Sequence, residues 1–199
     1  MNLKPLDHRI KYYKLYMFLD NLDNFPEYQL PKGYSFVFYQ DGDRDKWIEI
    51  ESSAGEFKNY EEGIKAWNEY YKDHEDELYN RMVFIKHDNE YVGTLTAYYD
   101  VKGIDDPSVG RLHWFSIKEE YQGKGLAKPL ITFVLHIMKE LGYRNAKLST
   151  QTNSWLAIKI YLDFGFKPYN ESLGWGIVKH ILKRKELDAY EEISDIFEV

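Results

Sequence analysis

The spacing of apolar residues divides the chain into short strands and longer helices. Aromatic and β-branched residues gather in short runs bounded by Gly, Pro, Asp or Asn, which is typical of strands. Other stretches repeat apolar residues every three or four positions, which is typical of amphipathic helices. Residues 10–19 fit either a strand or a short helix. We expect helices at 43–53, 59–79, 125–141 and 153–164, and strands at 34–40, 82–86, 91–99, 111–117, 146–150, 166–169 and 175–182.

The order of these elements predicts a mixed α/β (α+β) fold, with antiparallel hairpins first and strand–helix–strand units later. Residues 1–32 hold three of the six prolines and are interpreted as an N-terminal extension. One domain is expected over 33–182, followed by an acidic tail at 183–199. Apolar residues recur at helical spacing within that tail, which predicts a docked or partner-binding helix; they are Leu187, Tyr190, Ile193 and Phe197.

Composition narrows the function classes. The chain of 199 residues has no cysteine, which excludes disulfides, thiolate metal sites and a cysteine nucleophile. Its net charge of −7 argues against nucleic acid as the main partner and mildly favours a cationic or amine ligand. No stretch approaches the roughly 18 apolar residues of a membrane helix. Together with the absence of cysteine, this leads us to expect a soluble, cytoplasmic protein. The histidines other than His113 show no metal-ligand spacing, so no metal is expected.

The stretch from Phe115 to Ala127 carries the most chemical information. It contains the end of a strand, a turn, a glycine loop and the start of a long apolar helix. Glycines allow backbone N–H groups to approach a ligand, and a helix N-terminus favours an anion such as pyrophosphate. Lys124 and Lys128 add positive charge. The patterns of a P-loop and of a dinucleotide fingerprint are absent. A turn that needs glycine for its geometry alone is the alternative interpretation.

Two blocks of residues carry a resemblance to a known family. The first has the pattern Gln/Arg-x-x-Gly-x-Gly/Ala, matched by Gln122, Gly125 and Ala127. The second, in the same order and spacing as in the family, is Asn153, Ala157, Tyr161 and Gly165-Phe166. Together they resemble the Gcn5-related N-acetyltransferase (GNAT) superfamily over 33–182, most strongly over 111–169.

The resemblance implies a twisted, mostly antiparallel sheet, flanked by helices and splayed at its centre between the strands 111–117 and 146–150. It also implies acetyl-CoA as co-substrate, with the pantetheine arm in the splay and the pyrophosphate on the loop. Asn153 would contact the arm, or cap its own helix, or do both. The residues expected to contact acetyl-CoA are Phe115, Ser116, Ile117, Gln122, Gly123, Lys124, Gly125, Leu126, Ala127, Lys128 and Asn153.

Two residues are candidates for catalysis. The resemblance places Tyr161 near the thioester, where its hydroxyl would protonate the departing CoA thiolate; otherwise it is one packed aromatic among 18 tyrosines. Some family members carry a glutamate base at the position of Arg111, and arginine cannot accept a proton. His113 is the nearest substitute, and strand alternation puts it on one face with Arg111, Phe115 and Ile117. A packed histidine with a chain of water molecules as base is the alternative.

The sequence therefore predicts an acetyl-CoA-dependent N-acetyltransferase that transfers the acetyl group directly to an amine. A non-catalytic acyl-CoA sensor or interaction module is the competing hypothesis. The acceptor, a small amine or a peptide, is not identified by the sequence, nor is the oligomeric state, a homodimer included. Four aromatic residues lie where related proteins build the acceptor site, and they fit a packed core as well; they are Trp47, Trp67, Tyr70 and Tyr71.

Overall fold

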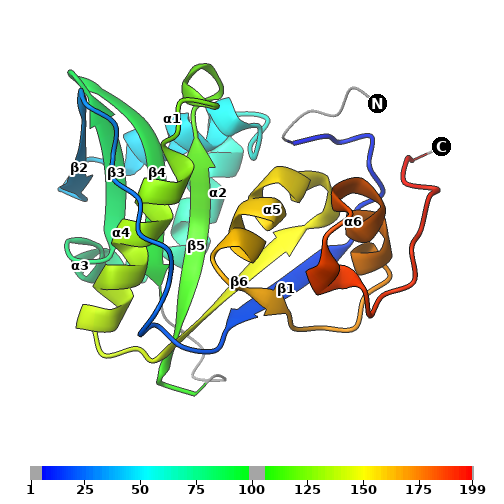
Figure 1. Ribbon diagram of the computed structural model, residues 1–199. Helices are drawn as coiled ribbons and strands as arrows, with labels where there is room; N and C mark the ends of the chain where they lie inside the picture. Colours follow the sequence, from blue (N-terminus) through cyan, green and yellow to red (C-terminus); the bar gives the residue numbers. More distant parts are fainter. Residues whose placement is uncertain (1–5, 99–105, 199) are drawn as a thin grey trace. The chain divides into compact units, whose positions relative to one another are not determined.

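The computed structural model describes residues 6–98 and 106–198 (Figure 1). Residues 99 and 199, which end the predicted strand 91–99 and the predicted tail, lie outside the described residues, as do residues 1–5 of the predicted extension. Contacts along the chain define two compact units, one of residues 27–144 and one of residues 1–26 with 145–199. Each is described by itself.

The unit of residues 27–144 contains a four-stranded antiparallel sheet in the order β2-β3-β4-β5. A tight turn at Asp88, whose φ is +53°, joins the two middle strands into a hairpin. The strands are short and rich in β-branched and aromatic residues, as the sequence predicts. Their bounds are β2 (Tyr34–Phe38), β3 (Met82–His87), β4 (Glu90–Tyr98) and β5 (Val109–Ile117).

Helices cover both faces of this sheet (Figure 1). α4 (Ala127–Glu140) lies on one face, where Phe133 stacks on Phe36 of β2 with ring centroids 4.4 Å apart. The other face is covered by α1 (Arg44–Ala54) and α2 (Tyr60–Tyr70), which approach closely because Gly63 has no side chain to meet Ile48. The shorter helices of the unit are η1 (Lys72–His74), α3 (Glu75–Leu78) and η2 (Glu119–Tyr121).

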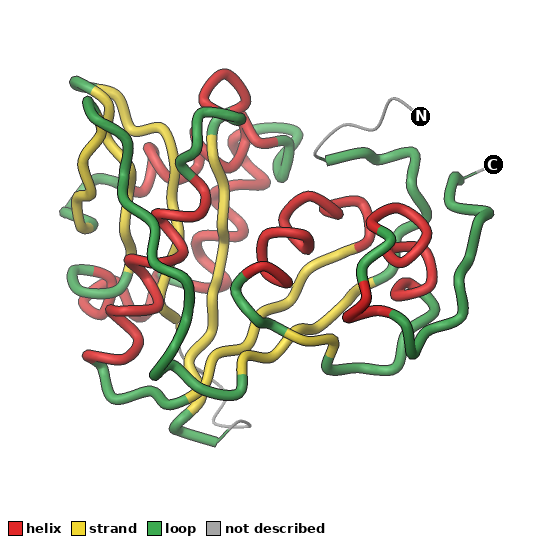
Figure 2. Tube along the Cα trace, in the orientation of Figure 1, coloured by secondary structure: helices red, strands yellow, loops and turns green. Residues whose placement is uncertain are grey.

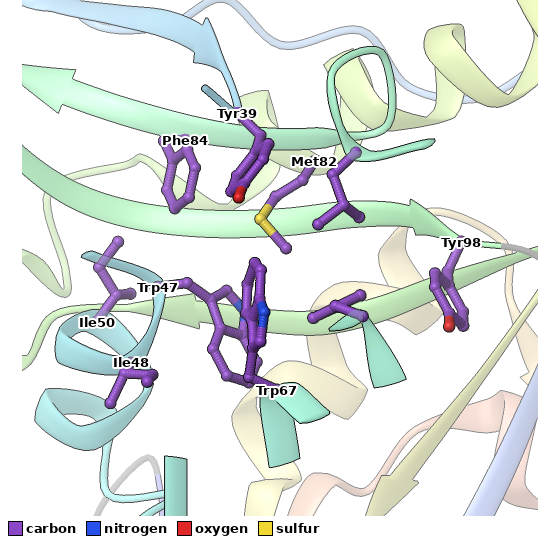
Figure 3. Close-up of a cluster of buried hydrophobic side chains, with 10 residues drawn as sticks. Tyr39, Trp47, Ile48, Ile50, Trp67, Met82, Phe84 and Tyr98 are labelled. Atoms are coloured by element: carbon purple, nitrogen blue, oxygen red, sulfur yellow. The ribbon is translucent and has the colours of Figure 1, made fainter. Parts of the chain in front are cut away.

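Large aromatic side chains fill the space between the sheet and these two helices (Figure 3). Trp47 of α1 and Trp67 of α2 are fully buried and lie 5.4 Å apart between ring centroids. Met82 and Phe84 of β3 complete the packing from the sheet side. Burial of such side chains contributes about 2–3 kcal/mol each, so this cluster positions α1 and α2 against the sheet.

The second unit contains a three-stranded antiparallel sheet with β1 at its centre. The sequence allowed either a strand or a helix at residues 10–19, and the structure has a strand. Its buried residues Leu15, Met17 and Leu19 alternate with more exposed ones. The elements of this unit are β1 (Lys14–Leu19), β6 (Asn145–Gln151), η3 (Thr152–Ser154), α5 (Trp155–Asp163), β7 (Lys167–Pro168), α6 (Gly174–Leu182) and η4 (Lys185–Leu187).

Three expectations from the sequence are corrected here. The extension expected over residues 1–32 is not separate from the folded unit, because β1 within it pairs with β6 along its whole length. Residues 175–182 form α6 rather than a strand; Ile177 and Ile181, four positions apart, pack against Ile10 and Ile196. The chain after α6 is not a long helix, since only the single turn η4 occurs in the described part (Figure 2).

The C-terminal segment is instead extended and fixed in place. It forms a bridge between Phe197 and Ile10, and the carbonyl of Ile196 accepts a hydrogen bond of 2.8 Å from the N–H of Lys11. It also passes over Gly176, where a Cβ atom would lie only 2.2 Å from the Glu191 carbonyl oxygen. The predicted helical spacing was therefore overridden by long-range pairing of both chain ends.

The predicted fold class is confirmed. In the described parts of the chain, the strands pair antiparallel within each unit, and helices flank the sheets. The expected splay involves strands of both units and stays a prediction. Among the described residues, no helix is both long and apolar enough to cross a membrane.

Candidate functional site

The loop between β5 and α4 has the backbone that the sequence predicts for an anion site. Gly123 and Gly125 have φ values of +74° and +78°, a region that disfavours side chains. A Cβ atom at Gly123 would meet nothing within 4 Å among the described atoms, and one at Gly125 only Pro31 at 4.0 Å. The space beside the loop is therefore open to a ligand.

The backbone N–H groups at the start of α4 are available to a ligand beside the loop. The helix begins at Ala127 with no side-chain cap and no acidic residue in its first turn. Its first N–H groups lack partners within the helix, and the helix dipole makes this end attractive to an anion. Lys124 lies over the ring of Tyr121 at 4.3 Å, and Lys128 over that of Tyr28 at 4.9 Å. The loop and the helix end together fit a pyrophosphate.

Gln122 and Lys118 hold the turn before the loop. The Gln122 side-chain amide donates a hydrogen bond of 3.0 Å to the Ile117 carbonyl, which ties the loop to the end of β5. Burial of the Lys118 ammonium lowers its pKa, but the ion pairs and hydrogen bonds with Glu49 and Glu90 together outweigh burial, so the pKa is raised. The position of the loop is thus fixed by β5 and α1.

β5 contains a bulge that changes which side chains share a face. Thr94 of β4 pairs with Ser116, and Thr96 pairs with His113. The two pairs are two residues apart on β4 but three residues apart on β5, so β5 contains one extra residue, which is a β-bulge. Trp114 has the unusual φ of +51°. The alternation predicted for His113, Phe115 and Ile117 is therefore wrong: His113 lies on the face of Ser116, toward α1 and α2.

His113 lies among aromatic rings. It stacks on Tyr98 with centroids 4.6 Å apart, and its Nδ1 is 3.0 Å from the hydroxyl of Tyr71. The Tyr71 hydroxyl in turn donates to Thr96 at 3.2 Å. Burial, reinforced by the charge of Arg111, lowers the pKa of His113 to about 3. The ring is therefore neutral at physiological pH.

Glu51 is a buried carboxyl on the same face, and sequence reasoning missed it. Its Oε2 accepts a hydrogen bond of 2.5 Å from the Ser116 hydroxyl, while Oε1 has no partner among the described residues. Burial raises its pKa well above 4.5, the hydrogen bond from Ser116 opposing the shift. The available signal was its position four residues after Trp47, on the apolar stripe of α1, where a charged side chain is unusual.

We predict that Glu51→Gln removes a pH dependence of stability. Because the folded carboxyl keeps its proton above pH 4.5 while the unfolded one releases it, the free energy of unfolding of the wild type falls as pH rises from there. Urea denaturation at pH 5 to 8 should show wild type losing stability relative to Glu51→Gln. The exposed Glu140→Gln is the control, and parallel curves for wild type and Glu51→Gln would contradict the shift.

Tyr161 and Asn153 belong to the other unit. Tyr161 lies in α5, is 6% exposed and contacts the ring of Phe166 edge-on at 5.9 Å. Asn153 lies in η3 rather than at the N-cap of α5, and the side chain at the cap position, Ser154, makes no capping hydrogen bond to the helix backbone. The capping role is therefore wrong. The buried Oδ1 of Asn153 has no hydrogen-bond partner among the described residues, which suits a role toward a ligand.

The aromatic residues considered for an acceptor site separate into two groups. Trp47, Trp67 and Tyr71 are fully buried and belong to the core. Tyr70 is half-buried at the edge of that core. Core packing is thus confirmed for three of the four. No group of three or more His, Asp or Glu side chains suited to a metal occurs in the part of the chain that the structure describes.

The strand β5, the left-handed glycine loop and the uncapped start of α4 together form a strand–helix turn whose geometry suits an anionic ligand. A family model of the Acetyltransferase (GNAT) family matches residues 44–166. The chain belongs to this family. Its general reaction is acyl transfer to an amine, and the family uses acetyl-CoA.

Individual relatives are distant. N-acetyltransferase 8B of Mus musculus is 30% identical over 93 residues, which are 43% of this chain and 40% of the relative. The match thus spans about two-fifths of that relative's length. A GCN5-related N-acetyltransferase from Sphaerobacter thermophilus shares the fold, with a TM-score of 0.62 and 18% identity over 81% of this chain and 50% of the other.

A second solved structure also shares the fold. AAC(6')-Iy, in complex with the bisubstrate analog CoA-S-monomethyl-acetylneamine, aligns with a TM-score of 0.53 and 14% identity. The alignment covers 70% of this chain and 94% of that protein. At these identities, the two structures establish the shared fold.

Proposed function

We propose that this chain transfers an acetyl group from acetyl-CoA directly to an amine. The observation that carries the proposal is the loop of residues 122–128, whose positive φ angles, open space and uncapped helix start suit the pyrophosphate. The donor would be held by the expected set: the strand residues Phe115, Ser116 and Ile117, the loop residues, and Asn153.

In the proposed reaction, the neutral amine nitrogen attacks the thioester carbonyl, a C–N bond forms and the C–S bond breaks. We assign the backbone N–H of Phe115, at the end of β5 beside the loop, to the developing oxyanion. Tyr161 donates its hydroxyl proton to the departing thiolate. The amine's own proton passes to water, because a histidine with a pKa of about 3 is a poor acceptor at neutral pH.

The experiment is an acetyl-transfer assay with purified protein, acetyl-CoA and a panel of amines. Free CoA is measured with a thiol reagent, and N-acetylated product by mass spectrometry. Because the chain has no cysteine, the protein adds no thiol background. Release of CoA with matching product is expected. Binding of acetyl-CoA without transfer to any amine would favour the sensor hypothesis instead.

The pKa of His113 gives a separate prediction. We expect His113→Gln to leave the acidic limb of kcat/KM between about pH 5 and 8 unchanged, because wild-type His113 is already neutral there and protonates only near pH 3. A steady-state pH profile of both proteins measures this. If the limb moved in the variant, His113 would be the base that the sequence predicts.

A further inference from the structure

Four half-buried rings form one continuous patch on the unit of residues 27–144. Phe57, in the connection between α1 and α2, lies 5.3 Å from Trp114 of β5 between centroids. Tyr70, at the end of α2, lies 4.9 Å from His113 and 5.9 Å from Trp114. All four retain exposed surface. We call these four residues the aromatic patch.

The bulge of β5 places Trp114 in this patch. In a regular strand, Trp114 and His113 would point to opposite faces, whereas here both contact Tyr70. A left-handed backbone costs a bulky residue about 1–2 kcal/mol. Strain of this kind persists where the surrounding structure enforces it, and it is concentrated at functional sites. The position of the Trp114 ring is therefore maintained against a local penalty.

Several polar atoms in and next to the patch are buried without a hydrogen-bond partner in the described chain. They are the indole N–H groups of Trp47 and Trp114, Oε1 of Glu51 and Oγ1 of Thr94. Trp47 and Trp114 are in contact, and Glu51 is one turn from Trp47 on α1. Native proteins leave few buried polar groups unpaired, and each such group calls for an explanation, a bound ligand or water among them.

The net negative charge of the residues around the patch favours a positively charged ligand. Residues 44–79, which contain α1 and α2, hold eleven acidic side chains, the buried Glu51 included, and five basic ones; their formal net charge of −6 is most of the −7 of the chain. Glu56 and Glu69 adjoin Phe57 and Tyr70 in sequence and are exposed. Positive charges near the patch include Lys58, which also adjoins Phe57 in sequence and is exposed, and Arg111, near His113. Faces of aromatic rings also attract cations, so the acidic residues and the aromatic rings both favour a cationic ligand.

We propose that the aromatic patch binds the acceptor and that this acceptor is an arylalkylamine, a primary amine cation with a flat aromatic body. The inference rests on the proposed function and specifies its substrate. The aromatic body stacks among Phe57, Tyr70 and Trp114, and the ammonium is attracted by the acidic surroundings before it loses its proton. His113 is neutral and adds no repelling charge.

The test compares 2-phenylethylamine with putrescine and with phenylalanine, which adds a carboxylate to the same aromatic amine. We expect kcat/KM for 2-phenylethylamine to exceed that of the other two by about tenfold or more. Calorimetry in the presence of CoA measures the binding of each amine separately. Binding of 2-phenylethylamine without transfer would contradict the proposed function alone. No binding, or a preference for putrescine or phenylalanine, would contradict the acceptor inference alone.

Variants of the aromatic patch test whether it is the source of the preference for 2-phenylethylamine. Phe57→Leu and Trp114→Leu are expected to raise the KM for 2-phenylethylamine about tenfold, with CoA affinity changed less than twofold. Phe57 lies in a loop, so its variant serves if Trp114→Leu fails to fold. Tyr60→Leu, at a ring that is 48% exposed at the start of α2, is the matched control. An equal rise in the control, or no rise in Phe57→Leu, would overturn the assignment.

Discussion

Replacing Gly125 with valine is expected to abolish acetyl-CoA binding while the protein stays folded. The residue has a φ of +78°, and a Cβ atom there would project into the open space beside the loop. The branched side chain would occupy the place of the pyrophosphate, and the strained backbone would turn the N–H groups away. Isothermal titration calorimetry with CoA measures the loss, which we expect to exceed about 100-fold in Kd.

The control separates the loss of the site from general backbone strain. Gly142, just beyond the other end of α4, also has a positive φ of +89°, and nothing lies within 4 Å of its Cβ position in the described structure. Gly142→Val should lose a similar stability, about 1–2 kcal/mol, and keep its CoA affinity. Unchanged affinity in a folded Gly125→Val protein, or equal losses in both variants, would disprove the role of the loop.

The loop and its helix could be predicted because their signals are local. Glycines at 123 and 125 followed by an apolar 3.6-residue period specify a turn and a helix whatever the rest of the chain does. The strands of the β3–β4 hairpin were equally accessible, since Asp88 and Asn89 mark the turn between them. These elements contain most of the residues expected to bind the donor.

Other features depend on contacts distant in sequence. The bulge at Trp114 contains no glycine that would indicate it in the sequence. Its one extra residue puts Phe115 and Ile117 on the opposite face from the one predicted. The sequence of α6 also predicts a strand, because Trp175, Ile177 and Ile181 fit both the strand and the helix period in a short run. Its helical state follows from packing against Ile10 and the extended C-terminal segment. Tertiary contacts decided both.

The candidate site was predicted unevenly for the same reason. Glycine positions and a helix start are visible in a sequence, whereas the burial of Glu51 and the lowered pKa of His113 arise only when α1, α2 and β5 pack together. His113 was considered as a base from its unperturbed pKa near 6.5, and desolvation removes that property. The aromatic patch depends on the bulge of β5, so it could not be predicted from the sequence either.

Tyr161→Phe is expected to preserve acetyl-CoA binding and to slow turnover by roughly 10²–10⁴, the usual contribution of a positioned general acid. Phenylalanine keeps the edge-on contact with Phe166 and removes only the hydroxyl. A thiol has a pKa of about 8.5, so thiolate is a fair leaving group without help, and the loss should lie toward the lower end of that range.

Single-turnover kinetics is the measurement of choice, because slow product release would hide part of the effect in kcat. Tyr169→Phe is the control in the same unit: its ring is 66% exposed and stacks on Phe18, so removal of its hydroxyl should leave the rate unchanged. Calorimetry should give the same CoA affinity for both variants and wild type. A Tyr161→Phe rate within about twofold of wild type would show that Tyr161 only packs, and another proton donor would then have to be sought among the groups near the thioester.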